Sequence, residues 1–515
     1  MKVVTAQTMQ ELDRQTIREL GIPGLELMEH AGHACMEAIF HEFGYNGGKR
    51  AFIFAGRGNN GGDGYVIARL LWQSGWQVRV CILAERDRIE GDAAINLEQL
   101  PSDAISYCTV PDQLAGLCQQ EIRQADVIVD ALLGTGLNSE VGGIYREAVG
   151  LINASGRPVL AVDIPSGIHG SSGRVLGCAV RATVTVTFAA AKLGHILYPG
   201  AEYTGRLVVA DIGIPAELIE QASGCEFITS DNIRPLLRPR DRQAHKGHFG
   251  HCLIVAGSRG KTGAAALSAN SAVRTGSGLV TLVVPESLNP ILEIKTTEAM
   301  TVPLADAGSG YLSDGAFQKI AGLLPGRDAL AIGPGLGQEP TTVALVQSLV
   351  RMADLPLVID ADGLNAVSQS TDCLLNKKSS SVVLTPHPGE MARLLGTTIA
   401  DVEHDRIATA RRFAAAFGVH LILKGSRTVI AAPDGSVAIN GSGNPGMASG
   451  GMGDVLTGII VSLLGQGRSA WDACRLGVFI HGYAADLVAQ DKGEIGMNAG
   501  DVQEKIPYVY QKLIT

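Results

Sequence analysis

The chain has 515 residues, of which 46% are hydrophobic and 18% are charged, so it is a compact globular protein of two domains rather than a disordered chain. The formal net charge of −9 argues against a general nucleic-acid binder, which needs a basic surface. The nine cysteines form no CxxC pair, so we expect reduced thiols. We find neither a signal-peptide pattern nor an apolar run of membrane-spanning length, and we expect a cytoplasmic protein without membrane contact.

The first half of the sequence predicts an α/β fold. A long helix is expected near residues 8–43. Residues 50–215 then alternate short apolar runs with helix-like segments, beginning with RAFIFAG, QVRVCILAE and DVIVDALLG and continuing with RPVLAVDIP, ATVTVTFAA and RLVVADIG. This alternation is typical of a doubly wound, mainly parallel sheet.

A second α/β series begins with HCLIVAG at residue 251 and ends in TVIAAPDGSVAIN, which predicts a hairpin around Asp434 and Gly435. The segment between the two series, residues 228–250, is rich in Pro, Arg and polar residues and predicts a linker. We assign residues 1–222 to the first domain and 223–515 to the second. The halves show no obvious internal repeat.

The loop AGRGNNGGDG (55–64) follows a predicted strand and opens a helix. Its glycines match GxGxxG with Glu85 at the end of the next strand, which is a weak dinucleotide-binding pattern. The side chains of Asn59, Asn60 and Asp63 favour a polar ligand or a cation instead. A capped turn, with Asp63 as an ordinary acid of the first helical turn, is the structural alternative.

Two further oxygen-rich loops follow predicted strands, one carrying Asp130 and residues 134–140 and the other carrying Asp163 and Ser166. Open α/β sheets bind ligands at the carboxyl ends of parallel strands. Three such loops at one edge therefore predict a binding site, although any single acid at a strand end is also compatible with a cap.

In the second half, SGGMGDVLTGII (449–460) places three glycines before a helix that starts near Asp454. Backbone N–H groups and a helix N-terminus stabilise an anion there, as phosphoryl transfer requires. Asp454 is placed to accept a proton from an attacking hydroxyl. A simple helix cap by Asp454 is the alternative, but a cap does not need the surrounding glycines.

Other loops of the second half also follow strands. KGSRT (424–428) is a plausible nucleotide-facing turn, whereas GSRGKTG (257–263) departs from the P-loop pattern because Val255 stands where glycine is required. Thr262 and Gly263 fit a substrate loop. Asp360 and Asp362 fit either a magnesium or phosphate region or turn caps, and His387 between prolines fits either a ligand contact or a structural role.

The motifs GNNGGDG, DALLGTG and DIPSG together resemble the NAD(P)H-hydrate epimerase family, over about residues 1–220. The resemblance implies a Rossmann-like αβα sandwich and makes Asp163 the candidate acid/base. It implies a potassium ion held by Asn60, Asp130 and Ser166. The implied hydrate-binding residues are Asn59, Asn60, Gly61, Gly62, Asp63, Gly134, Thr135, Gly136, Leu137, Asn138, Ser139, Glu140 and Asp163.

The motifs HKGHFG, GPGLG, DADGLNA, LTPHPGE, KGSRT and GGMGDVL resemble the ADP-dependent NAD(P)H-hydrate dehydratase family, which has a ribokinase-like fold, over about residues 225–515. The resemblance implies that Asp454 is catalytic, that ADP is the co-substrate and that Mg²⁺ acts at this site. The implied hydrate contacts are Gly263, Gly335, His387 and Asp454, and the implied nucleotide contacts are Lys424, Gly425, Ser426, Arg427, Thr428 and Gly453.

The two resemblances together imply a bifunctional enzyme that repairs NADH hydrate and NADPH hydrate, and we expect it to be a homo-oligomer. Three alternatives remain open from the sequence. The chain is compatible with a ribokinase-like small-molecule kinase that has a Rossmann-like binding domain, with a first half that only binds a ligand or partner, and with an NAD-dependent dehydrogenase.

Overall fold

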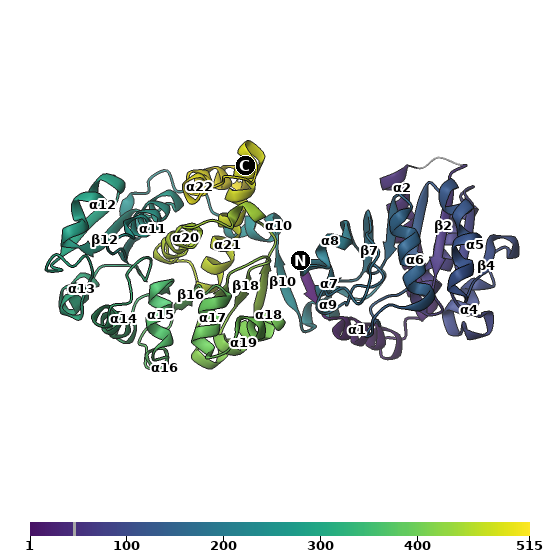
Figure 1. Ribbon diagram of the computed structural model, residues 1–515, viewed down its shortest axis with the longest axis horizontal. Helices are drawn as coiled ribbons and strands as arrows, with labels where there is room; N and C mark the ends of the chain where they lie inside the picture. The colour runs from purple at the N-terminus through teal and green to yellow at the C-terminus, as the bar shows by residue number, and fades with distance from the viewer. Residues whose placement is uncertain (45–47, 515) are drawn as a thin grey trace. The chain divides into compact units, whose positions relative to one another are not determined.

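The computed structural model describes residues 1–44 and 48–514, which form two compact units. One unit spans Lys2–Cys225, and the other contains Met1 and the chain from Glu226 onward. Figure 1 colours the first unit purple to blue and the second teal to yellow. Each unit is an α/β layer structure with its own sheet.

The N-terminal unit is built on a seven-stranded sheet in which every neighbouring pair is parallel. Its order is β4 (Ile105–Tyr107), β3 (Gln77–Ile82), β2 (Arg50–Ala55), β5 (Val127–Ala131), β6 (Val159–Val162), β7 (Val184–Phe188) and β9 (Arg206–Ala210). A short parallel pair joins β1 (Lys2–Val4) to β8 (Ala191–Lys192). This is the Rossmann-like, doubly wound arrangement that the apolar runs predict.

Two helices, not one, precede this sheet. The predicted helix over residues 8–43 is wrong, because α1 (Ala6–Arg18) ends before Gly21 and α2 (Gly24–Phe43) begins after Pro23. Gly21 has a φ of 75°, a left-handed backbone conformation that favours glycine and that a right-handed helix cannot include. Pro23 directly precedes α2, and its ring fixes the φ angle there. The break matters because it gives α1 a direction of its own.

Helices cover both faces of the N-terminal sheet. Alternate strand residues therefore point into different cores, with Ile53 packing in one core together with α2 and α3, and Phe52 and Phe54 packing in the other with α5 and α6. The remaining helical bounds are α3 (Asn59–Gln73), α4 (Gly91–Leu97), α5 (Pro111–Gln124), α6 (Gly143–Ala154), α7 (Leu193–Ile196), α8 (Ala201–Thr204) and α9 (Ala216–Gln221).

The C-terminal unit has a longer mixed sheet. Seven parallel strands run β13 (Met300–Leu304), β12 (Leu279–Pro285), β11 (His251–Val255), β14 (Ala329–Ile332), β15 (Leu357–Ile359), β16 (Val382–Leu384) and β17 (His420–Leu423). The antiparallel strands β18 (Val429–Ala431) and β19 (Val437–Asn440) confirm the predicted hairpin, and β10 (Cys225–Ile228) pairs in parallel with β19.

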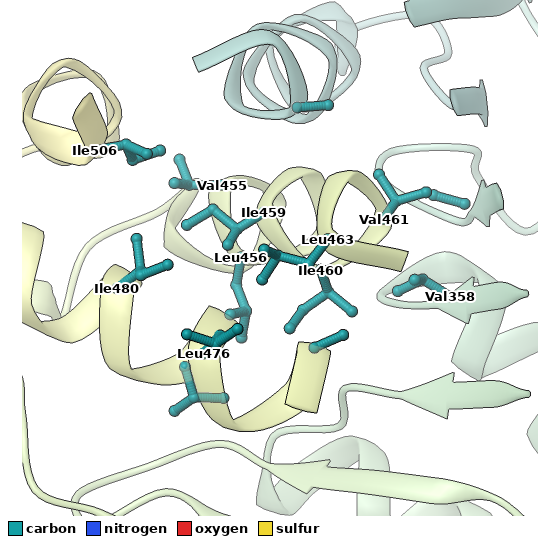
Figure 2. Close-up of a cluster of buried hydrophobic side chains, with 14 of the residues drawn as sticks. Val358, Val455, Leu456, Ile459, Ile460, Val461, Leu463, Leu476, Ile480 and Ile506 are labelled. Atoms are coloured by element: carbon teal, nitrogen blue, oxygen red, sulfur yellow. The ribbon is translucent and has the colours of Figure 1, made fainter. Parts of the chain in front are cut away.

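Helix α20 (Met452–Gly465) is the buried centre of the C-terminal unit. Its apolar side chains pack against α21 (Ala470–Lys492), α22 (Ala499–Ile514) and the sheet (Figure 2). A helix held on so many sides presents its N-terminus at a fixed place.

The other helices of this unit lie around its sheet (Figure 1). They are α10 (Ser230–Ile233), α11 (Thr262–Thr275), α12 (Asn289–Lys295), α13 (Phe317–Leu323), α14 (Pro340–Met352), α15 (Asp362–Ser368), α16 (Asp372–Leu375), α17 (Pro388–Leu395), α18 (Ile399–His404) and α19 (Arg406–Phe417). Within the described ranges, no helix combines the length and the apolar character that a transmembrane span requires.

Candidate active sites

The N-terminal unit contains a cavity of about 910 Å³ at the carboxyl ends of β2, β3, β5 and β6. One wall comes from α1, through Met9, Gln10, Asp13 and Ile17. The structure brings most of the predicted hydrate-binding residues into this cavity: Asn59, Asn60, Asp63, Gly134, Thr135, Gly136, Leu137, Asn138, Ser139 and Asp163. The three loops therefore form one site.

The remaining predicted residues of this site lie elsewhere. Gly61 and Gly62 lie behind the wall, on the first turn of α3. A Cβ at Gly61 would lie 2.0 Å from the carbonyl oxygen of Gly56, and one at Gly62 would lie 2.7 Å from Met28, so both positions need glycine for packing. Glu140 is exposed to solvent.

Asp163 forms a buried ion pair that the sequence analysis missed. Its Oδ1 lies 2.6 Å from Lys192 Nζ and accepts a hydrogen bond of 3.0 Å from Thr187 Oγ1. Lys192 is 1% exposed and also donates to Thr187 Oγ1 and to a backbone carbonyl. Burial raises the pKa of Asp163, but Lys192 outweighs it, so the pKa lies below its usual value and the carboxylate is ionised.

The backbone at Asp163 is held in an uncommon conformation with a φ of 65°. His195 fixes this turn, because its Nδ1 accepts from the Lys192 backbone N–H and its Nε2 then donates to the Asp163 carbonyl oxygen, at 2.9 Å. Burial, reinforced by the Lys192 charge, lowers the pKa of His195 to about 4. His195 is therefore a neutral ring that positions Asp163.

Two of the other carboxyl groups in the cavity, Asp13 and Asp63, interact electrostatically with Asp163. Burial raises the pKa of Asp13 to about 6, with the Asp163 charge adding to the rise and Lys192 opposing it. Burial, together with the charges of Asp163 and Asp13, raises the pKa of Asp63 well above its usual value. One site thus holds an ionised carboxylate beside carboxyl groups that retain protons more strongly.

Asp130 and Ser166 lie together next to the cavity loops. Asp130 is 0% exposed and accepts hydrogen bonds from Ser166 Oγ at 2.6 Å and from the Ser166 backbone N–H at 2.8 Å. Burial raises the pKa of Asp130 to about 6 despite these bonds. Ser166 Oγ also contacts the backbone of Leu133, and Asn60 packs against the next residue, Gly134.

In the C-terminal unit, Asp454 lies on the first turn of α20, after Gly451 with a φ of 92°. Burial raises the pKa of Asp454 to about 7, with the Asp360 charge adding to the rise and Lys424 opposing it. A carboxyl with such a pKa exchanges protons near neutral pH, as a general base must.

Lys424 and Asp360 form a buried network beneath Asp454. Lys424 Nζ lies 2.9 Å from Asp360 Oδ1 and 3.7 Å from Glu390 Oε2, and Thr457 Oγ1 donates to Asp360 Oδ2 at 2.8 Å. Burial lowers the pKa of Lys424, but the carboxylates of Asp360 and Glu390 raise it further, so the ammonium stays charged. Gly453 leaves room here, since a Cβ at that position would lie 3.2 Å from Lys424 Nζ.

A second cavity of about 380 Å³ adjoins this network through Glu390. The predicted hydrate contacts Gly263 and Gly335 line it together with Asp362. Asp362 Oδ2 accepts from Lys261 Nζ and from the Gly337 N–H, both at 2.9 Å. The residue before it, Ala361, has a φ of 49° and also lines the cavity.

His387, by contrast, caps α17. Its Nδ1 accepts hydrogen bonds from the backbone N–H groups of Gly389 at 3.0 Å and Glu390 at 3.3 Å. In return, Glu390 Oε2 accepts a hydrogen bond from the His387 backbone N–H. Burial lowers the pKa of His387. The ring therefore caps α17 and stays half exposed beside Glu390, and its predicted contact with the hydrate stays a prediction.

The predicted nucleotide loop, Lys424 to Thr428, is shaped by an arginine that the sequence analysis missed. Arg406 donates to the carbonyl oxygens of Leu423 and Lys424 at 3.0 Å and of Ser426 at 2.7 Å. Gly425 has a φ of 141° and Arg427 a φ of 54°, and Thr428 Oγ1 donates to the Gly425 carbonyl at 2.9 Å. The loop is thus a fixed turn, and its Lys424 side chain enters the network near Asp454.

Family models match both halves of the chain. A model described as NAD(P)H-hydrate dehydratase matches residues 252–508, and one described as YjeF-related protein N-terminus matches residues 24–194. The match positions fall within the two structural units. The site residues named above lie inside the matches, except Asp13 and the other α1 wall residues, which precede the first match, and His195, which follows it.

Full-length relatives and solved structures agree with these matches. A bifunctional NAD(P)H-hydrate repair enzyme from Moorella thermoacetica is 45% identical over 100% of this chain and 97% of its own length. The ADP/ATP-dependent NAD(P)H-hydrate dehydratase from Bacillus subtilis, co-crystallised with ATP/Mg²⁺, is 31% identical, with a TM-score of 0.50 over 56% of this chain and 99% of its own.

A ribokinase-like superfamily protein from Enterococcus faecalis is 26% identical, with a TM-score of 0.50 over 56% of this chain and 96% of its own. The likeness confirms the ribokinase-like fold expected for the C-terminal unit. Both domains match family models, and the similarity to the Moorella thermoacetica enzyme extends over the whole chain. The chain therefore belongs to the family of bifunctional NAD(P)H-hydrate repair enzymes.

Proposed function

We propose that this protein interconverts the R and S forms of NADH hydrate and NADPH hydrate in its N-terminal unit, and dehydrates the S form in its C-terminal unit with ADP, giving AMP and phosphate. The observation that carries the second reaction is Asp454, half-buried at the N-terminus of α20, with a pKa that this burial raises to about 7. The logic of the fusion is that a stereospecific dehydratase uses one epimer and the epimerase resupplies it.

The dehydration begins with the hydroxyl of the hydrate. Asp454 accepts its proton as the oxygen attacks the terminal phosphorus of ADP, and AMP leaves. The C–O bond to phosphate then breaks, and the adjacent carbon loses a proton, so that inorganic phosphate leaves and the double bond of the reduced nicotinamide is restored. The N–H groups around Gly451 and Gly453 and the α20 N-terminus stabilise the negative charge that grows on the transferred phosphoryl group.

The nucleotide is assigned to the turn at Lys424–Thr428, which Arg406 holds in place. Magnesium, when bound, would neutralise phosphate charge. Of the two acids predicted for it, Asp362 lines the adjoining cavity, whereas both oxygens of Asp360 are engaged by Lys424 and Thr457. Within residues 1–44 and 48–514 no group of three acidic, histidine or cysteine side chains forms a metal site by itself. Mg²⁺ is usually held by one or two carboxylates together with substrate phosphates, and bound here it would supply positive charge to the transferred phosphoryl group. Gly263 and Gly335 contact the hydrate in the adjoining cavity.

In the N-terminal unit Asn59, Asn60 and Asp63 at the start of α3 bind the hydrate together with the loop at residues 134–139, and Asp163 is the base. Its ionised carboxylate is fixed by Lys192, and only Oδ1 is engaged by a described side chain, so Oδ2 is left to accept a proton. The cavity of about 910 Å³ has the size of a typical small-molecule site.

The potassium ion expected at Asn60, Asp130 and Ser166 fits these residues chemically. Asp130 is fully buried, and its described hydrogen-bond donors are all uncharged, so a cation would balance its charge. The three residues offer oxygen atoms, which hard cations prefer. Bound there, K⁺ would supply fixed positive charge beside the hydrate pocket. Removing K⁺ should weaken hydrate binding, and an Asp130→Asn protein should no longer respond to K⁺ in the same titration.

A coupled assay tests the whole proposal. The purified protein is mixed with separated R or S hydrate and with ADP or ATP, and the absorbance of the reduced nicotinamide is followed. S hydrate with ADP should recover the absorbance without delay, and R hydrate only after epimerisation. A stable phosphorylated product would indicate a ribokinase-like kinase instead, and net oxidation or reduction would indicate a dehydrogenase.

We also propose a cytoplasmic location, supported by nine cysteines that are all free thiols and mostly buried. The homo-oligomer stays a prediction.

A further inference from the structure

The epimerase cavity holds more acid/base groups than the residues assigned so far. Among the carboxyl groups that line it are Asp13, Asp63 and Asp163, which come from α1, α3 and the end of β6. Lys192 also lines it and pairs with Asp163 alone at 2.6 Å. Its wall further carries Arg57, Glu85, Arg88, Asp92 and Tyr145. The carboxyl groups of Asp13 and Asp63 make no hydrogen bond to any residue described here.

The ammonium of Lys192 pairs with Asp163 and not with Asp13 or Asp63, so the three carboxyl groups have different electrostatic environments. Asp163 is ionised next to Lys192, whereas burial raises the pKa of Asp13 to about 6 and that of Asp63 well above its usual value. When neighbouring carboxyl groups have pKa values shifted in opposite directions, one acts as the acid and another as the base. Asp63 is only 9% exposed, while Asp13 is partly exposed on the α1 wall and is the carboxyl with better access to a ligand.

On this basis, and given the epimerase activity proposed above, we propose that Asp13 is the catalytic acid of epimerisation, working opposite the base Asp163. It protonates the ring nitrogen of the hydrate as the carbon–nitrogen bond opens. α1 thus supplies a catalytic residue from outside the glycine-rich loop and the strand-end loops.

The chemistry of the hydrate requires such a pair. Water adds to an enamine at the carbon bonded to nitrogen, so the hydroxyl-bearing carbon is a hemiaminal. Asp163 removes the hydroxyl proton, a C=O bond forms, and the C–N bond breaks with its electron pair passing to nitrogen, which takes the proton of Asp13. Rotation about the adjacent C–C bond presents the other carbonyl face. Nitrogen then attacks and returns its proton to Asp13, while oxygen takes its proton back from Asp163, with no oxidant or reductant involved.

The test uses the full-length protein, pure R hydrate and the Asp13→Asn, Asp13→Glu and Glu11→Gln variants. Glu11 is an exposed acid two residues away on the same helix, paired with Arg14, and is the matched control. The Asp13→Asn variant should lose about 10²- to 10⁴-fold in epimerisation kcat, with unchanged Kd for the hydrate by fluorescence titration. The Glu variant should recover part of the rate, and Glu11→Gln should match wild type. Dehydration of pure S hydrate by the same preparation gives the concentration of protein whose C-terminal unit is active.

The pH profile adds a readout that a structural role would not change. Wild-type kcat/KM should fall along an alkaline limb above about pH 6, where the pKa of Asp13 lies, and the residual activity of Asp13→Asn should lack that limb. The assignment of Asp13 would be wrong if the Asp13→Asn variant had the same turnover as Glu11→Gln. It would also be wrong if the Asp13→Asn and Asp13→Glu variants were equally inactive. Solvent ¹⁸O gained at each inversion would overturn the ring-opening step. Inactivity of the wild-type protein toward R hydrate would instead refute the epimerase function itself.

Discussion

Lys424 Nζ lies 2.9 Å from Asp360 Oδ1, and a Cβ at position 453 would lie 3.2 Å from the same Nζ, a close contact that glycine avoids. Asp454, the next residue, takes its raised pKa from burial and from the same Asp360 charge. The ion pair therefore links the predicted nucleotide turn, the glycine loop and the base in one network.

Replacing Asp454 by Asn should remove the proton acceptor of the dehydratase. We expect ADP-dependent dehydration of S hydrate to fall by about 10²- to 10⁴-fold, measured by recovery of the reduced-nicotinamide absorbance. Epimerisation by the same protein should be unchanged, because its site lies in the other unit. Full dehydration activity in this variant would remove Asp454 from the mechanism.

The dehydratase should be pH-dependent in a defined direction. Burial raises the pKa of Asp454 to about 7, and a base works only when deprotonated, so kcat/KM should rise with pH up to about 7 and then level off. The Asp360→Asn change removes a neighbouring negative charge and should move this limb to lower pH. The matched control is Asp354→Asn, a change at an exposed acid before β15, and the pH profile of this variant should not shift. An unshifted limb in Asp360→Asn would contradict the electrostatic link.

Lys192→Met should destabilise the N-terminal unit, because it leaves the Asp163 carboxylate buried without its cation. Removing one partner of a buried pair costs about 3–5 kcal/mol in the free energy of unfolding. Urea unfolding of the full-length protein measures this, followed by tryptophan fluorescence, to which Trp72 and Trp76 of this unit and Trp471 of the other unit contribute. The Lys192→Met/Asp163→Asn double variant removes the unpaired charge and should recover much of the loss, and equal stability of Lys192→Met and wild type would show that the pair contributes little.

Gly453→Ala should impair dehydration without unfolding the protein. The new Cβ would lie 3.2 Å from Lys424 Nζ, so the ammonium must move away from Asp360. A displacement of this kind should lower kcat about ten- to hundredfold. Gly322→Ala is the matched control, since a Cβ there meets nothing within 4 Å on helix α13. Similar rates in both variants would show that the site tolerates the shift.

The sequence itself determined the fold class of both units and the loops that form their sites. Apolar runs separated by helical segments predict parallel sheets, and polar or glycine-rich residues after each run mark the carboxyl ends of the strands. These signals are local. The same local signals missed β13, whose MTVPL sequence is partly exposed and contains Pro303, and they missed the helix break at Gly21 and Pro23.

Only the tertiary structure decided which side chains share a site. Lys192 lies 29 residues from Asp163, and Lys424 lies 64 residues from Asp360. Asp13 reaches the cavity from a helix that carries no recognisable motif. Such pairings depend on the order of the strands and on helix direction, which no short pattern encodes. The pKa values that separate acids from bases follow from burial and from these distant charges, so they too exist only in the folded chain.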